Sequence, residues 1–194
     1  MATNKLLNRI VIPENVDYDR GSDDVFSDLH NYTYGITSDP LTQFSIVFSA
    51  LVHDVDHTGV PNGQLAKENP DMAELYRNQS LAEQNSVDLA WDLFMDPRYN
   101  KLKECIAASE EERKRFRQLL VNCVMATDIF DPTMKALRNK RWDKAFHQDK
   151  STSEALSGDE DRNTKATIVI EHIIQAADVA HTMQHWHIYQ KWNE

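Results

Sequence analysis

Cysteine is scarce in this chain, which has Cys105 and Cys123 and no others. Two cysteines without a CxxC spacing cannot form the disulfide framework of a small secreted domain, and they favour a reducing compartment. No stretch is apolar enough to cross a bilayer, and the N-terminus lacks the apolar core and cleavage site of a signal peptide. We predict a cytoplasmic segment without direct membrane insertion, or the cytosolic part of a larger, membrane-anchored protein.

Positive charge is also in short supply, because 21 Lys and Arg face 31 Asp and Glu and leave a formal net charge of −10. Clustered Lys and Arg supply most of the affinity of proteins for nucleic acids and anionic membranes, so we predict no nucleic-acid partner. Any phosphate group that the chain binds would need a local cation. The apolar content of 41% is enough for one globular domain with a core.

Glycine and proline are few, with 5 and 6 in 194 residues, and runs of β-branched residues between tight turns are rare. This pattern predicts an all-α fold of helices joined by polar loops. Pro40 suits the first position of a helix that Ser38 or Asp39 would cap. We expect irregular chain over 15–39 and a mobile polar loop over 148–165. The expected helices cover 4–12, 40–55, 80–95, 98–108, 110–129, 133–147 and 166–192.

The stretch "HDVDH" places four polar groups directly after the apolar run "FSIVFSALV". If the helix continues, His53 and His57 lie four residues apart on one face and Asp54 projects beside them. A single histidine at a helix end is more often a cap or a packing residue. Burying several such groups without a counterion is costly, so the combination predicts a metal site.

A second carboxylate belongs to the last long helix. Ile170, Ile174 and Ala177 form an apolar stripe, and the spacing directs Asp178 toward the same core side, where it needs a cation or several donors. His181 and His185 continue that face, and we interpret both as the solvated end of the helix. Histidine and carboxylate together suit zinc or manganese, with magnesium at a carboxylate-rich neighbouring position.

The segment "HDVDHTGVPN" resembles the metal-binding signature of the class I cyclic nucleotide phosphodiesterases. That signature is His-Asp, an apolar residue, any residue, His, any residue, Gly or Ala, two residues and Asn. Three further segments resemble those of the family in the family's order: "YRNQSLAE" from Tyr76 to Glu83, "ATD" from Ala126 to Asp128, and "AADVAHTMQHW" from Ala176 to Trp186. The resemblance covers nearly the whole chain.

The resemblance implies an all-α, multi-helix HD-type phosphodiesterase bundle in which residues 1–194 form a single partial catalytic domain. It also implies hydrolysis of the 3′ phosphoester bond of cyclic AMP or cyclic GMP, in cyclic-nucleotide signal transduction. The cofactors would be two divalent metal ions, zinc and magnesium or manganese, with a bridging hydroxide that attacks phosphorus.

The family's site residues carry over to matching positions of this sequence. By resemblance His53, Asp54 and Asp178 would ligate the first metal, and Asp54 would bridge to the second. The catalytic residues would be His57 and Glu83, the latter bonded to water on the second metal. Three further positions have supporting roles by resemblance: Asn62 and Asp128 would hold the ligands in place, and Tyr76 would lie at the substrate.

Some of the family's pattern is absent. The motif His-Asn-x-x-His-Ala supplies the general-acid histidine and one metal ligand, and "HNYTYG" from His30 matches only its start, with Tyr34 at the second histidine. We interpret His30 as a loop residue, and we expect the motif before Met1 and the purine-binding Gln and Phe after Glu194. The domain would then be incomplete at both ends, and the chain as written would have low or no activity.

Smaller departures lie beside the matching residues. Gln84, Asn85 and Ser86 stand where many members have Asn-His-His, which removes a histidine that supports the general acid. His181 and Thr182 stand where the family has Asn and Pro after the metal-binding aspartate. We interpret these as subfamily variations.

Two other functions remain open. Another HD-type metal-dependent phosphohydrolase, acting on a nucleoside phosphate, would share the His-Asp pair and the distant aspartate, but it would not explain "HTGVPN". A truncated, non-catalytic relative could retain the metal scaffold and serve as a binding or regulatory module. Either form could belong to a longer parent protein with additional domains.

Overall fold

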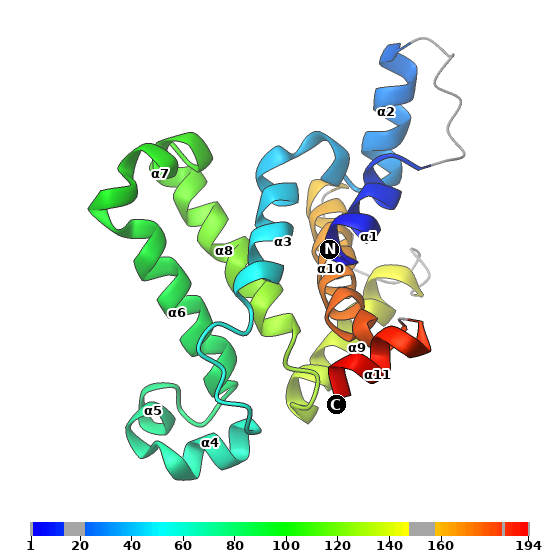
Figure 1. Cartoon of the computed structure of the whole chain (residues 1–194). Coiled ribbons are helices and arrows are strands. Elements are labelled where there is room, and N and C mark those ends of the chain that lie inside the picture. Colours follow the sequence, from blue (N-terminus) through cyan, green and yellow to red (C-terminus); the bar gives the residue numbers. More distant parts are fainter. Residues whose placement is uncertain (1, 14–21, 148–157, 184, 194) are drawn as a thin grey trace. The chain divides into compact units, whose positions relative to one another are not determined.

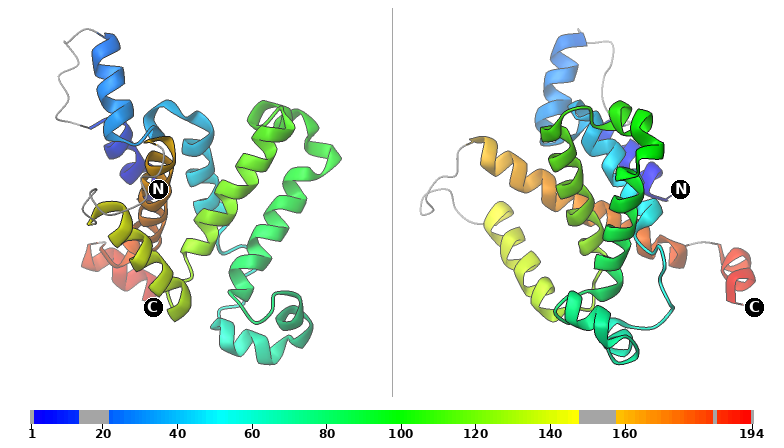
Figure 2. Two further views of the ribbon diagram at one scale, coloured as in Figure 1. Left: turned by 180° about the vertical axis from the view of Figure 1, so that it is seen from behind. Right: turned by 90° about the vertical axis from the view of Figure 1, so that its left-hand side faces the viewer.

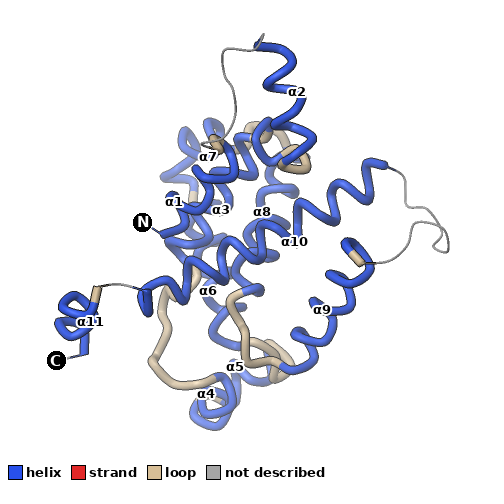
Figure 3. The backbone as a smooth tube through the Cα atoms, turned by 90° about the vertical axis from the view of Figure 1, so that its right-hand side faces the viewer, coloured by secondary structure: helices blue, strands red, loops and turns tan. Residues whose placement is uncertain are grey.

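The structure is a computed structural model that describes residues 2–13, 22–147, 158–183 and 185–193. Within these ranges all regular structure is helical and no strand occurs, and the tube of Figure 3 accordingly shows blue helices and tan loops but no red strand. The described chain divides into two compact units. Unit 1 comprises residues 1–43 and 137–194, and unit 2 comprises residues 44–136. The all-α prediction is confirmed, and the extent of a single domain stays a prediction.

Figure 1 labels the helices along the chain. The α-helices are α1 (Ala2–Val11), α2 (Ser22–Tyr32), α3 (Pro40–Val52), α4 (Asn62–Glu68), α5 (Pro70–Leu75), α6 (Leu81–Met95), α7 (Asn100–Ile106), α8 (Glu110–Ala126), α9 (Pro132–Phe146), α10 (Gly158–Asp178) and α11 (Trp186–Asn193). Three short 3-10 helices are η1 (Ile36–Ser38), η2 (Pro97–Tyr99) and η3 (Val179–Met183).

The main core of unit 2 surrounds Phe116 on α8, whose side chain is fully buried. Four rings from α3 and α6 contact it, and the nearest, Phe94, has its centroid 4.9 Å away. The helices α6 and α8 lie side by side in Figures 1 and 2. Phe48 and Val52, near the end of α3, pack against the same two helices. This packing fixes the point at which the "HDVDH" segment begins.

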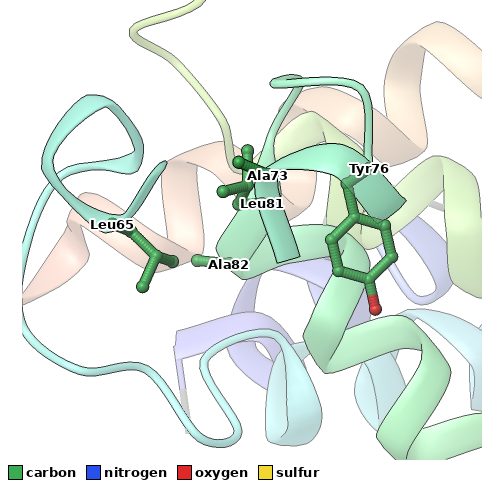
Figure 4. Close-up of a cluster of buried hydrophobic side chains, with 5 residues drawn as sticks. All are labelled: Leu65, Ala73, Tyr76, Leu81 and Ala82. Atoms are coloured by element: carbon green, nitrogen blue, oxygen red, sulfur yellow. The ribbon is translucent and has the colours of Figure 1, made fainter. Parts of the chain in front are cut away.

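A second cluster in unit 2 joins α4 and α5 to the start of α6. Figure 4 shows its five buried residues, which are Leu65, Ala73, Tyr76, Leu81 and Ala82. The sequence analysis predicted neither α4 nor α5. Both helices are short. At α5, the side chain of Asn69 caps the first turn by accepting from Met72 N at 3.1 Å, and Pro70 follows as the first helical residue.

Local capping explains two helix starts. The carboxylate of Asp39 accepts from Thr42 N at 3.1 Å, so the predicted start of α3 at Pro40 is confirmed. At α8, Ser109 Oγ accepts from Glu112 N at 3.1 Å and Ser109 N donates to Glu112 Oε2 at 3.0 Å. This reciprocal pair is a capping box, and it fixes the first turn of the helix that carries Phe116.

In unit 1, α1 packs against α10, and α9 is held to α10 by two adjacent contacts. Arg141 pairs with Glu171, a buried carboxylate, and the ring of Trp142 lies 4.7 Å from that of His172. Because the two pairs are consecutive on both helices, they fix the register between them.

The expected irregular segment over 15–39 is wrong in its second half. Residues Ser22–Tyr32 form α2, since Asp23 and Asp24 favour a helix N-terminus and Val25 and Leu29, four residues apart, are both buried. His30 therefore lies in a helix, with Nδ1 3.0 Å from Ser38 Oγ, and not in a loop. The many acidic residues of this segment obscure, in the sequence pattern, the short apolar stripe formed by Val25 and Leu29.

The predicted polar loop over 148–165 is also partly wrong. Residues 148–157 lie outside the described residues, but residues 158–165 form the first two turns of α10. Three acidic residues begin that helix, and Lys165 donates to Asp161 at 2.6 Å, four residues earlier. Charged pairs at helical spacing thus explain why this polar stretch is helical.

The predicted single helix over 166–192 is interrupted. The α-helix ends at Asp178 and gives way to η3, in which Thr182 Oγ1 donates to Val179 O at 2.8 Å. A hydroxyl that bonds the chain's own carbonyl competes with the helical N–H, so it favours a break. Among the helices of the described chain, none combines the length and the apolar character that a membrane span requires.

Candidate active site

The segment from His53 to His57 is a turn, so the prediction that His53 and His57 share a helix face is wrong. The helix α3 ends at Val52, and Asp56 has φ 62°, in the left-handed region. The two imidazoles make different hydrogen bonds. The segment is nevertheless hydrogen bonded, since Val55 N donates to Val52 O at 3.1 Å.

His53 and Asp54 converge at the start of this turn. His53 Nδ1 lies 3.0 Å from Ala50 O, and because a carbonyl can only accept, Nδ1 carries the proton. The other nitrogen, Nε2, lies 3.3 Å from Asp54 Oδ2. In the neutral ring, a nitrogen lone pair and a carboxylate oxygen therefore face each other. A divalent cation between such donors would remove this repulsion, so the pair fits a metal.

His57 has the opposite arrangement. Its Nδ1 accepts from Gly59 N at 3.0 Å, so in the neutral ring the proton lies on Nε2. Gly59 itself has φ 81°, a conformation in which glycine is strongly favoured. The ring of His57 is exposed. It can therefore offer an Nε2–H donor to a group at the surface of the site.

Asn62, Glu83 and Asp128 form one polar network. Asn62 Nδ2 donates to Glu83 Oε2 at 2.9 Å and to Asp128 Oδ2 at 3.4 Å. The Oδ1 atom of the same amide accepts from Ala82 N at 2.9 Å. A single side chain thus connects the first turn of α4, the first turn of α6 and the segment after α8. The structure brings together three of the predicted site residues.

Ser80 completes the network, and the sequence analysis did not single it out. Its hydroxyl donates to Asp128 Oδ2 at 2.7 Å, and Phe130 N and Asp131 N donate to Asp128 Oδ1. Asp128 is buried, so these donors offset the cost of burying a carboxylate. Ser80 itself has φ 40°, an uncommon conformation for a residue other than glycine.

Burial raises the pKa of the Glu83 carboxyl above its ordinary value, and the negative charge of Asp128 adds to this shift. The hydrogen bond from Asn62 and the proximity of His57 act in the opposite direction. Glu83 is therefore a carboxyl that gives up its proton less readily than a surface glutamate. Such a group is suited to general acid–base work.

Two neighbours of Glu83 on α6 bind the turn. Asn85 Nδ2 donates to Asp56 Oδ2 at 3.2 Å, and Ser86 Oγ donates to Val55 O at 2.8 Å. Both residues were noted in the sequence only as departures from a family pattern. The two partners of each bond lie about 30 residues apart in the sequence. No local sequence pattern indicates such contacts, so only the fold shows them.

Tyr76 lies in the core cluster of Figure 4, and its hydroxyl donates to Asp88 Oδ2 at 3.1 Å. Burial, followed by the hydrogen bond and charge of Asp88, raises the pKa of Tyr76 to about 12. The residue packs α5 against α6. A contact with substrate stays a prediction.

Asp178, the third predicted ligand, ends α10 in unit 1, whereas His53 and Asp54 belong to unit 2. No group of three or more His, Cys, Asp or Glu side chains with metal-binding geometry occurs among the residues described. The joint ligation by His53, Asp54 and Asp178 therefore stays a prediction. Within unit 2, the chemistry of the first two residues fits a divalent ion.

The comparisons with known proteins agree with this helical site. Residues 26–194 match the family of 3′5′-cyclic nucleotide phosphodiesterases, and the chain therefore belongs to that family. The family's members are hydrolases, and membership implies dependence on divalent metal in general. These findings confirm the resemblance that the sequence motifs indicated.

Two relatives illustrate the match. Human dual specificity calcium/calmodulin-dependent 3′,5′-cyclic nucleotide phosphodiesterase 1C is 29% identical over 150 residues, which are 77% of this chain and 19% of that protein. The probable 3′,5′-cyclic-AMP phosphodiesterase pde-4 of Caenorhabditis elegans is 27% identical over 154 residues, which are 79% of this chain and 22% of that protein. The chain thus spans about a fifth of the length of these relatives.

A solved structure supports the fold. The phosphodiesterase domain of Salpingoeca rosetta rhodopsin phosphodiesterase has a TM-score of 0.60 and 20% sequence identity, and the match covers 98% of this chain and 56% of that one. At this identity the likeness shows the fold alone. Together with the family match, it confirms the predicted HD-type helical bundle.

Proposed function

We propose that this chain contributes the metal-binding part of an enzyme that hydrolyses the 3′ phosphoester bond of cyclic AMP or cyclic GMP to give the 5′-monophosphate. The observation that carries the proposal is the Asn62 amide, which joins Glu83 and Asp128 beside the turn that bears His53 and Asp54. The network combines a partly buried carboxyl of raised pKa, Glu83, with a His-Asp pair suited to a cation. Family membership supports the reaction type.

In this proposal His53, Asp54 and Asp178 would hold a divalent ion, zinc in the first instance, and Asp54 would also serve a second ion, magnesium or manganese. When bound, such ions acidify water and offset the charge that develops on the phosphoryl oxygens. They also make an acidic chain, with a net charge of −10, locally attractive to an anionic nucleotide.

The chain's own residues then have separate tasks. His53 presents Nε2 because Ala50 O fixes the proton on Nδ1. His57 donates through Nε2 to a phosphoryl oxygen, since Gly59 N occupies its Nδ1. Glu83, held by Asn62 at one oxygen, accepts a hydrogen bond from water at the other and can move a proton.

We place the reaction in cyclic-nucleotide signalling in the cytoplasm, with the nucleotide as partner, without nucleic acid and with further domains in a longer protein. The small fraction of each relative that the chain covers supports the last point.

The test measures bound metal and hydrolysis on the same purified chain. Elemental analysis should find stoichiometric metal, and His53→Ala and Asp54→Ala should each lose it. Cyclic AMP and cyclic GMP hydrolysis is assayed in parallel, with Asp178→Ala as a third variant. A folded chain that retains all its metal after His53→Ala and Asp54→Ala would refute the assignment. Hydrolysis that survives Asp178→Ala would remove that residue from the site.

A further inference from the structure

The turn that bears the proposed metal ligands is held from one side by a single helix. Asn85 and Ser86, in the second turn of α6, donate the two bonds, which reach Asp56 and Val55 directly. These two residues lie between Asp54 and His57. The bonds that hold Val55 and Asp56 therefore also set the orientation of Asp54 and His57.

The geometry of the turn requires such support. Asp56 has φ 62°, a conformation that a residue other than glycine keeps only where its surroundings hold it. Asn85 Nδ2 contacts the carboxylate of Asp56 at 3.2 Å. Ser86 is fully buried, and its hydroxyl contacts Val55 O at 2.8 Å. One bond thus anchors the side chain and the other the backbone.

We propose that Asn85 and Ser86 are positioning residues that hold the turn at Val55 and Asp56, so that Asp54 and His57 keep the orientation that the metal site needs. The inference rests on the proposed function for its metal part. Neither residue touches the reacting atoms, so neither is catalytic. Their role is to make the site rigid before the cation binds, as outer partners of metal ligands commonly do.

The test exchanges donor and acceptor in the full chain. Asn85→Asp places a second carboxylate against Asp56 and breaks the bond. Adding Asp56→Asn restores a donor–acceptor pair with the original net charge, and asparagine tolerates the left-handed conformation well. Ser86→Ala removes the backbone anchor. Asn122→Asp on α8 is the matched control, because it adds the same charge but can still accept from Gln118.

Two readouts follow each variant. Hydrogen–deuterium exchange reports the amides of residues 53–60, where Val55, His57 and Gly59 donate hydrogen bonds. Titration calorimetry reports the affinity for Mn²⁺. We expect Asn85→Asp to accelerate exchange in this segment and to weaken Mn²⁺ binding, each by about 10-fold. The double variant should return both to near the original values. By charge alone an added carboxylate would tighten cation binding, so weakening indicates lost geometry.

The inference would be overturned by unchanged exchange in both Asn85→Asp and Ser86→Ala, or by a double variant no better than Asn85→Asp alone. Altered exchange with unchanged Mn²⁺ affinity would also overturn it, because the turn would then not serve the metal. A wild-type chain that binds no Mn²⁺ would instead refute the proposed function, while the exchange rates would still decide whether the pair holds the turn.

Discussion

His53 and His57 hold their protons on opposite nitrogens. Ala50 O fixes the proton of His53 on Nδ1, whereas Gly59 N, by donating to Nδ1 of His57, leaves the proton of that ring on Nε2. Two imidazoles in one turn are thereby given different chemistry, one with a lone pair and one with a donor at the outer nitrogen. The difference comes from the backbone that follows α3, which positions one carbonyl and one N–H.

The tautomers can be observed directly. At about pH 9, well above the ordinary imidazole pKa of about 6.5, long-range ¹H–¹⁵N spectra should show a protonated Nδ1 for His53 and a protonated Nε2 for His57. Selective His57→Gln and His53→Gln variants assign the signals. Two rings with the same tautomer would contradict the hydrogen bonds described.

Asn62→Ala should destabilise unit 2 by about 2 kcal/mol, because Glu83 and Asp128 would lose a shared donor and Ala82 N its acceptor. Urea denaturation measures the change. Asn122→Ala, which removes one exposed bond to Gln118, is the control and should cost less than about 0.5 kcal/mol. Equal effects from the two variants would show that the network contributes nothing special.

Glu83 predicts a dependence of stability on pH. Its raised pKa means that the folded chain keeps this proton at a pH where the unfolded chain, with a pKa of about 4.3, has lost it. The folded state then binds more protons, so the free energy of unfolding falls as pH rises through this window. Glu83→Gln should remove that fall.

The measurement is a series of urea denaturations from about pH 4 to pH 8. The difference between Glu83→Gln and wild type should grow with pH and then level off above the folded pKa. Glu104→Gln on the exposed face of α7 serves as the control. A difference that is constant with pH would contradict the raised pKa.

Tyr76 should ionise late, with a pKa of about 12. Absorbance at about 295 nm should show a phenol that ionises in this range, and Tyr76→Phe should remove that signal. The neutral phenol is favoured in the fold, so its contribution to stability is complete below about pH 10 and is lost as pH rises toward 12. Asp88→Asn should move the late titration to lower pH, since the charge of Asp88 opposes ionisation.

The Arg141–Glu171 pair predicts unequal effects of its two single variants. The side chain of Glu171 is 9% exposed and that of Arg141 38% exposed. Arg141→Met strands a buried carboxylate and should cost about 3 kcal/mol, whereas Glu171→Gln leaves a cation that can reach water and should cost about 1 kcal/mol. The double variant should recover part of the larger loss. Equal single effects in urea denaturation would contradict the burial.

Local chemistry made several elements predictable. Pro40 preceded by Asp39 marked the start of α3, and the expected ranges 80–95, 110–129 and 133–147 match α6, α8 and α9 to within a few residues. Acidic composition concealed α2 and the first turns of α10, because a high density of charge is also typical of irregular chain. In both cases the acidic residues stabilise a helix N-terminus, so they indicate the start of a helix and not irregular chain.

The residues of the candidate site were predictable from the sequence, but their geometry was not. Motif resemblance supplied Asn62, Glu83 and Asp128, and the fold joins them. The helix register assumed for the two histidines failed because Asp56 adopts a left-handed conformation, which its residue type permits but does not dictate. The roles of Asn85 and Ser86 arise from contacts distant in sequence, which no periodicity encodes.

The left-handed residues Arg77, Asn78 and Ser80 also bear on thermostability engineering. Glycine at such a position relieves about 1–2 kcal/mol of strain, part of which the greater freedom of the unfolded chain offsets. The side chains of Arg77 and Asn78 are exposed, so glycine there would leave the polar network untouched. At Ser80 the same change would remove the donor to Asp128. Glycine at residue 77 would therefore raise heat tolerance and leave the polar network intact. Glycine at residue 80 would relieve the same strain but weaken the network.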